Sequence, residues 1–171
     1  MFSGKPIVYA AALLLLALLL GAVAFFLYSG SGKVSFNHGV ASGDPLADRV
    51  ILWTRVTPQA SGKQVRVRVE VAKEPGFKSI VKSLIATASA ESDYTVKVDV
   101  DGLHAGAVYY YRFRSGGVTS PVGRTKTLPR GDVNSVRLAV FSCANYPASH
   151  GGYFNVYGHA AKTASTCAVF A

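Results

Sequence analysis

The two cysteines are the residues of this chain with the widest choice of chemistry. Cys143 directly follows an apolar run at 136–142, and Cys167 lies near the C-terminus. A thiol in such a place suits a small buried residue, and two thiols in an oxidising compartment can form a disulfide. Two cysteines make no disulfide framework, so both interpretations stay open on the residues alone.

Two histidines lie in the same part of the chain and could suggest a metal site. His150 is in a predicted loop, and His159 is in a predicted helix. Metal ligands must converge on one point, which this spacing does not favour, so we interpret both histidines as surface residues.

Positive charge is the strongest global signal. The chain has 18 Lys and Arg against 9 Asp and Glu, and the net charge is +9. This charge favours anionic surroundings such as lipid headgroups, cell-wall polymers or phosphate-bearing substrates. The cations are scattered singly without an interleaved aromatic and basic motif, so we expect a basic surface and no nucleic-acid partner. Outward arginines on predicted strands motivate a binding hypothesis: Arg66, Arg68, Arg112 and Arg114.

An uncharged apolar segment runs from Ile7 to Tyr28. A helix needs about 20 apolar residues to cross a membrane, so the segment is long enough for a signal anchor. A cleaved signal peptide is the alternative, because Ala22-Val23-Ala24 suits a signal peptidase. Either interpretation places the following residues outside the cytoplasm, at the cell membrane if uncleaved and secreted or periplasmic if cleaved. The stretch 29–32, SGSG, reads as a linker.

Period-two alternation places the next part of the chain in β-strands. Valines alternate with charged residues at 65–71, and the pattern returns at 94–101 and 108–114. Neighbouring side chains on a strand point to opposite faces, so these runs have one apolar and one polar face. Repeated short strands between turn signals predict an all-β fold: an antiparallel immunoglobulin/fibronectin type III-like sandwich, preceded by one hydrophobic helix.

Two aromatic residues are predicted to have structural roles within this sandwich. Tyr109 follows Leu103 by six positions, as in the corner of fibronectin type III modules where a tyrosine hydroxyl bonds back to the chain. Trp53 lies on an early strand, where such modules often keep a core tryptophan. Large aromatics most often fill cores, so a ligand-binding pair is the less favoured alternative.

The pattern changes after Pro129. The run 136–142, VRLAVFS, is apolar without alternation, which suits a strand buried on both faces, and a helix is expected from Tyr153 to Lys162. We therefore expect a short incomplete α/β segment at the C-terminus. The final stretch, TASTCAVFA, reads as a neutral tail.

Several blocks of sequence together resemble the alkaline phosphatase D family. These are HGVASGDPLADRVILWTRVTP at 38–58, GLHAGAVYYYRF at 102–113, GRTKTLP at 123–129, and RLAVFSCANYP with GGYFNVYGHAAK between 137 and 162. The resemblance implies a sandwich domain followed by a calcineurin-like metallophosphatase domain that hydrolyses phosphate monoesters and diesters. It divides the chain into an anchor or signal peptide with its linker (1–32), a sandwich (33–128), and a linker with the truncated start of the metallophosphatase domain (129–171).

The resemblance also gives Cys143 a role. It matches the cysteine ligand to iron in a family whose centre holds iron and calcium, and a metal there would polarise the phosphoryl group. The family's further ligands, a Gly-Asp motif, an asparagine, aspartates and histidines, do not follow in this chain. A lone thiolate cannot hold such a centre, so we expect no metal to be bound by this chain.

The first functional hypothesis is therefore an N-terminal fragment of an exported alkaline phosphatase D-like phosphomonoesterase/phosphodiesterase, itself inactive and monomeric. Its expected partners are the membrane, through the N-terminal helix, and phosphate esters in the intact family. The alternative is a membrane-tethered β-sandwich binding module for anionic polymers or a protein partner.

Overall fold

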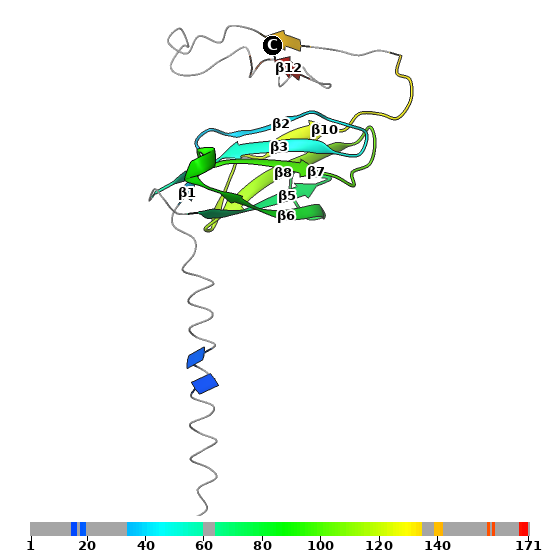
Figure 1. The fold of residues 1–171 in the computed structure, drawn as a ribbon. Helices are drawn as coiled ribbons and strands as arrows, with labels where there is room; N and C mark the ends of the chain where they lie inside the picture. The colour runs from blue at the N-terminus through cyan, green and yellow to red at the C-terminus, as the bar shows by residue number, and fades with distance from the viewer. Residues whose placement is uncertain are drawn as a thin grey trace, which may run out of the picture.

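Two antiparallel sheets pack face to face as a β-sandwich (Figure 1). The computed structural model describes residues 34–59, 64–134, 139–141 and 168–170, with 15, 16, 18, 19, 157 and 159. The smaller sheet has the order β2-β3-β7, and the larger sheet has the order β10-β8-β5-β6 with β9 paired to β8. The strands are β2 (Val40–Gly43), β3 (Val50–Arg55), β5 (Val65–Ala72), β6 (Ile80–Ala88), β7 (Thr95–Val100), β8 (Val108–Ser115), β9 (Val118–Thr119) and β10 (Gly123–Lys126). This all-β antiparallel sandwich is the predicted fold class.

The core lies between the sheets and is built by the predicted alternation. On β5, Val67 and Val69 are buried, whereas Arg66 and Arg68 between them are exposed. On β8, Tyr109, Tyr111 and Phe113 point inward and are buried. Burying valines and aromatics on one side of each strand drives the two sheets together and leaves their other sides to solvent.

Tyr109 has the structural role that the sequence predicts. Its hydroxyl accepts a hydrogen bond of 2.9 Å from the backbone N–H of His104. Leu103, next to this bond, is buried. The bond fastens the turn before β8 to the strand itself, and Tyr109 therefore belongs to the framework.

Trp53 does not have the predicted core position. The inward residues of β3 are Val50, Leu52 and Thr54. Trp53 lies between them in the alternation, so it points the other way and is half-buried on the outer side of the smaller sheet. Thr54 takes the inward place, because its hydroxyl donates a 2.8 Å bond to the carbonyl of Gly39. The cross-strand partners of Trp53 are Ala41 and Lys97.

The remaining strands complete the edges of the sandwich. β1 (Val34–Ser35) pairs with β4 (Thr57–Pro58). β6 lies at the edge of the larger sheet. β9 and β10 are separated at Ser120, whose hydroxyl accepts a 2.9 Å bond from the N–H of Phe113.

A separate two-stranded sheet includes residues of the C-terminal tail. β11 (Ala139–Phe141) pairs in parallel with β12 (Ala168–Phe170), so the stretch that we interpreted as a neutral tail contains a short strand. The two strands share the sequence Ala-Val-Phe. A parallel pair of apolar strands satisfies backbone groups that a single strand would leave open.

The predicted hydrophobic helix lies mostly outside the described residues. Of the apolar segment, only residues 15, 16, 18 and 19 are described, and they are helical. Tyr157 and His159, within the predicted C-terminal helix, are also helical. Among the residues that the structure describes, no helix is long and apolar enough to cross a membrane.

Candidate anion-binding face

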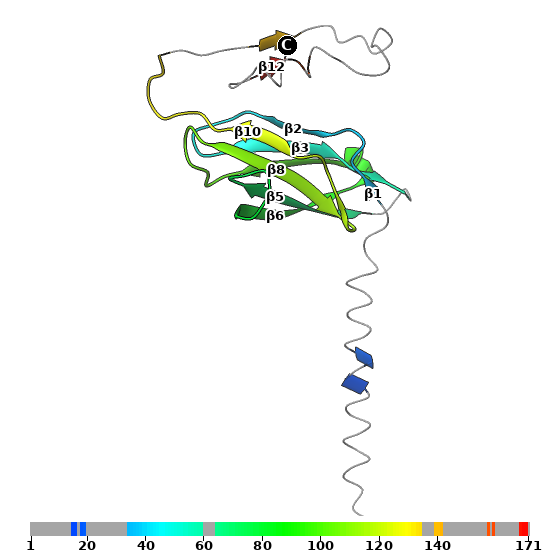
Figure 2. The same ribbon diagram turned by 180° about the vertical axis from the view of Figure 1, so that it is seen from behind.

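The outward side of the larger sheet collects cations from three neighbouring strands. Each strand contributes a pair two positions apart, because alternate residues share a face. β10, β8 and β5 are adjacent in that order, as the view from behind shows (Figure 2). We call this side the basic face and define it by Arg66 and Arg68 on β5, Arg112 and Arg114 on β8, and Arg124 and Lys126 on β10.

The register of the strands arranges these cations along a diagonal. Arg68 lies directly opposite Arg114 on the neighbouring strand. On the other side of β8, Arg124 is opposite Tyr110 and Lys126 is opposite Val108. The band therefore begins at Arg66, crosses β8 and ends at Lys126.

One carboxylate lies among these strands, and it is already engaged. The side chain of Glu70 is only 6% exposed. Its Oε2 accepts from Nε and NH2 of Arg112, both at 2.7 Å, and its Oε1 is 3.5 Å from NH1 of Arg114. The carboxylate thus orients two arginines of the face while remaining shielded from solvent.

Phe77 also contacts Arg112 of this cluster. The loop after β5 has φ 53° at Phe77, a backbone conformation that non-glycine residues rarely adopt. This loop brings the Phe77 ring to 4.0 Å from the guanidinium carbon of Arg112, where a cation–π contact forms. Arg112 is therefore fixed between an aromatic ring and a carboxylate, whereas the side chain of Arg114 remains 46% exposed.

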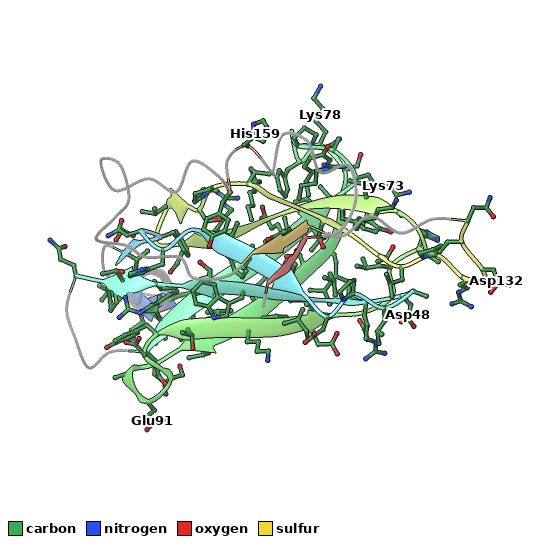
Figure 3. All side chains as sticks on the ribbon, turned by 90° about the horizontal axis from the view of Figure 1, so that it is seen from above. Asp48, Lys73, Lys78, Glu91, Asp132 and His159 are labelled. Carbon is green, nitrogen blue, oxygen red and sulfur yellow. The ribbon has the colours of Figure 1, made fainter. Side chains whose placement is uncertain are left out.

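The other cations of the face are open to solvent. Arg66, Arg68, Arg124 and Lys126 are exposed, and none forms an ion pair with a carboxylate in the part of the chain that the structure describes. Within the described residues, Arg68 reaches the hydroxyl of Ser83, at 3.4 Å. Figure 3 shows Lys73 and Lys78 projecting from the side of the sandwich opposite Glu91.

A shallow pocket adjoins the Lys126 end of the band. Its volume is about 450 Å³, and it is lined by Lys73, His104, Ala107, Val108 and Tyr109. Val108 is the cross-strand partner of Lys126. The pocket adds one ammonium and one imidazole to the surroundings of the basic face.

On the outer side of the smaller sheet, arginines are paired with aspartates. Arg55 pairs with both carboxylate oxygens of Asp93, at 2.8 and 2.9 Å, and Arg49 reaches Asp99 at 3.1 Å. The hydrogen bond from Arg55 holds the pKa of Asp93 below its usual range. Arg55 also donates to Nε2 of His38 at 2.6 Å. Because a guanidinium only donates, this ring nitrogen accepts, and the proton of a neutral His38 is on Nδ1.

The predicted metal ligand lies outside the described residues. Cys143 is among the residues that the structure leaves undescribed, as are Cys167 and His150, and His159 is exposed. Within the described ranges, no group of three or more His, Cys, Asp or Glu side chains could hold a metal ion. The described residues therefore do not fit an iron and calcium centre, and we derive no step through one.

The structure brings together four arginines that the sequence predicted to face outward, and it adds residues that we missed. Arg124 and Lys126 extend the band, and Glu70 anchors it. The signal for the first two was present in the alternation of GRTK, where Thr125 is buried between two exposed cations. The shielding of Glu70 depends on the pairing of β5 with β8, which the local sequence pattern does not indicate.

Comparison with known proteins identifies the family to which this fold belongs. The family described as PhoD-like phosphatase, N-terminal domain, matches residues 24–129. Alkaline phosphatase D of Bacillus subtilis (strain 168) is 44% identical over 135 residues, which are 74% of this chain and 23% of that protein. A solved structure of PhoD has a TM-score of 0.68 at 38% identity and covers 79% of this chain and 27% of that chain.

The chain spans about a quarter of the length of these relatives. All sandwich strands, from β1 to β10, lie within the matched residues. The basic face is therefore part of the matched domain, and the predicted family is confirmed. This chain belongs to the PhoD-like phosphatase N-terminal domain family.

Proposed function

We propose that this chain is the N-terminal part of an exported PhoD-like phosphomonoesterase/phosphodiesterase and does not itself turn over phosphate esters. The observation that carries the proposal is the 44% identity to alkaline phosphatase D, which extends over only 23% of that protein. This similarity supports the proposal that the chain derives from a phosphoric ester hydrolase. The matched part is an N-terminal domain by its family description.

The lack of turnover follows from the chemistry of the available donors. Two-metal phosphoryl transfer needs carboxylate and imidazole ligands that hold both ions and generate a hydroxide. Beyond Cys143 the sequence has His150 and His159 and neither Asp nor Glu. A thiolate with two separated imidazoles cannot fix two hard cations, so we propose that this chain binds neither iron nor calcium as a catalytic centre.

Export is the second part of the proposal. It is supported by the apolar segment 7–28, which is long enough to serve as a signal anchor or signal peptide. Protease added to intact cells should digest a tag placed after Ala171, whereas a tag that is protected until lysis would contradict export.

Turnover can be tested on the full chain in an uncharged detergent. With ferric iron and calcium supplied, we expect no hydrolysis of bis(p-nitrophenyl) phosphate above that of a Cys143→Ser control. Metal-dependent hydrolysis that is lost in the Cys143→Ser variant would refute the proposal and would assign Cys143 a catalytic ligand role.

A further inference from the structure

We propose that the basic face of the larger sheet is a docking surface for linear polyphosphate, a polymer that carries a charged phosphate group in every unit. The polymer would lie along the diagonal of cations from Arg66 to Lys126. This inference goes beyond the proposed function, because it needs neither a metal nor turnover. It also gives the binding hypothesis a defined surface and a defined ligand class.

The length of the band favours an extended ligand. Arg66, Arg68 with Arg114, Arg112, Arg124 and Lys126 occupy five successive levels along the strand direction. Each level is two residues, or about 6.8 Å, from the next, so the band is about 27 Å long. A single phosphate would contact one or two levels, whereas a chain of linked phosphates can contact all of them at once.

The types of side chain favour phosphate. Five of the six cations are arginines: Arg66, Arg68, Arg112, Arg114 and Arg124. A guanidinium presents its donors as a planar fork that matches two oxygens of a phosphate, whereas an ammonium acts as a point charge. Arg112 is already fixed by Glu70 and Phe77, so it offers its remaining donors with little loss of rotamer freedom.

The arrangement of like charges also points to a bound anion. Arg68 and Arg114 are direct cross-strand partners, and like charges in this position destabilise a sheet. The carboxylate of Glu70 is 3.5 Å from Arg114, and no comparable partner is recorded for Arg68 among the described residues. An anion between the two guanidinium groups would relieve their repulsion, which couples the stability of the face to ligand binding.

The distribution of acidic residues leaves the path of the polymer open. Apart from the shielded Glu70, the strands of the larger sheet carry no Asp or Glu. The exposed carboxylates of Asp93, Asp99 and Asp101 lie on or beside the smaller sheet and are paired, the last with Lys82 at the β6 edge. A polyanion on the basic face therefore meets no exposed carboxylate from these strands.

Fluorescence anisotropy with labelled inorganic polyphosphate tests the surface on the full chain in an uncharged detergent. The test variant is Arg68→Gln/Arg114→Gln, and the matched control is Arg49→Gln/Lys97→Gln, which removes the same charge from the outer side of the smaller sheet. We expect the affinity to fall at least tenfold in the test variant and less than twofold in the control. Equal losses would show a response to net charge alone and would overturn the proposal.

The salt dependence gives a second readout that a folding defect would not imitate. Binding that releases counterions weakens linearly on a log–log plot, by roughly 0.7 in slope for each phosphate contact on a flexible strand. We expect the test variant to reduce the slope by about 1.4 for its two lost contacts, with an unchanged thermal unfolding midpoint to within a few degrees. An unchanged slope would contradict the assignment of these arginines.

The ligand class is tested by competition. Poly-glutamate of matched charge should displace polyphosphate poorly, because the proposal requires phosphate oxygens. Equal competition by poly-glutamate, no binding of polyphosphate at low salt, or binding only to phosphatidylglycerol vesicles would each overturn the proposal. None of these results depends on the turnover assay. A result that overturns the docking surface therefore does not contradict the proposal that this chain is an inactive part of a PhoD-like enzyme.

Discussion

The two outer sides of the sandwich manage charge in opposite ways. On the smaller sheet, Arg55 pairs with Asp93 and Arg49 pairs with Asp99, and these groups are largely exposed. On the larger sheet, cations from three strands lie together, and the one carboxylate of these strands, Glu70, is shielded and contacts Arg112 and Arg114 on β8. Mixed charges are sufficient for solubility, so the segregation on the larger sheet calls for another reason. The difference teaches that position, rather than the net charge of the chain, indicates where an anion would bind.

The strongest way to test the comparison is to remove the central carboxylate of each side. Glu70→Gln should lower the free energy of unfolding by about 2 kcal/mol, because it leaves Arg112 without its anion. This is below the cost of breaking a fully buried pair, since the Arg112 side chain keeps 23% exposure. Asp93→Asn, with 73% exposure of the aspartate, should give a much smaller loss. Urea unfolding of both variants measures the difference, and equal losses would break the comparison.

A smaller effect should follow from relieving the repulsion within the basic face. Arg68→Thr removes a like charge opposite Arg114 and introduces a good strand former, so we expect a gain of about 0.5 kcal/mol in unfolding free energy. Lys97→Thr on the smaller sheet lies opposite Trp53 and should change stability less. Thermal unfolding of the two variants measures this, and a clear loss in Arg68→Thr would show that the arginine serves the fold.

The smallest effect concerns acid. The hydrogen bond with Arg55 lowers the pKa of Asp93 from its ordinary value of 3.8. A lowered folded pKa contributes stability above the unfolded pKa, and this contribution disappears as the pH falls through the folded pKa. The unfolding midpoints of the wild type and Asp93→Asn should therefore converge below pH 3.8. A difference between them that grows towards low pH would contradict the assignment.

Local sequence patterns predicted the sandwich well because strand periodicity is a local property. The valines of β5 and the aromatics of β8 face the core as their alternation requires. Trp53 shows where reasoning from residue type fails, because a large aromatic suggested a core position. Val50 and Leu52 face the core, so the alternation along β3 places Trp53 on the outer side of the sheet. When residue type and the alternation along a strand disagree, the alternation is the better guide to burial.

The candidate site was predictable only in part. Alternation showed that Arg66, Arg68, Arg112 and Arg114 face outward, but their common band depends on how β5, β8 and β10 pair. Strand pairing joins residues far apart in the chain, and no local pattern specifies its register. Cys143, predicted through the family resemblance, lies outside the described residues and stays a prediction.

The most direct measurement is NMR of the arginine side-chain Nε–Hε groups during titration with inorganic polyphosphate. It reports on both outer sides of the sandwich in a single sample. We predict saturable shifts at Arg66, Arg68, Arg114 and Arg124, with Arg49 and Arg55 unchanged because aspartates already occupy them. Shifts of similar size on both sides, or shifts confined to Arg49 and Arg55, would contradict the assignment of the basic face as the docking surface.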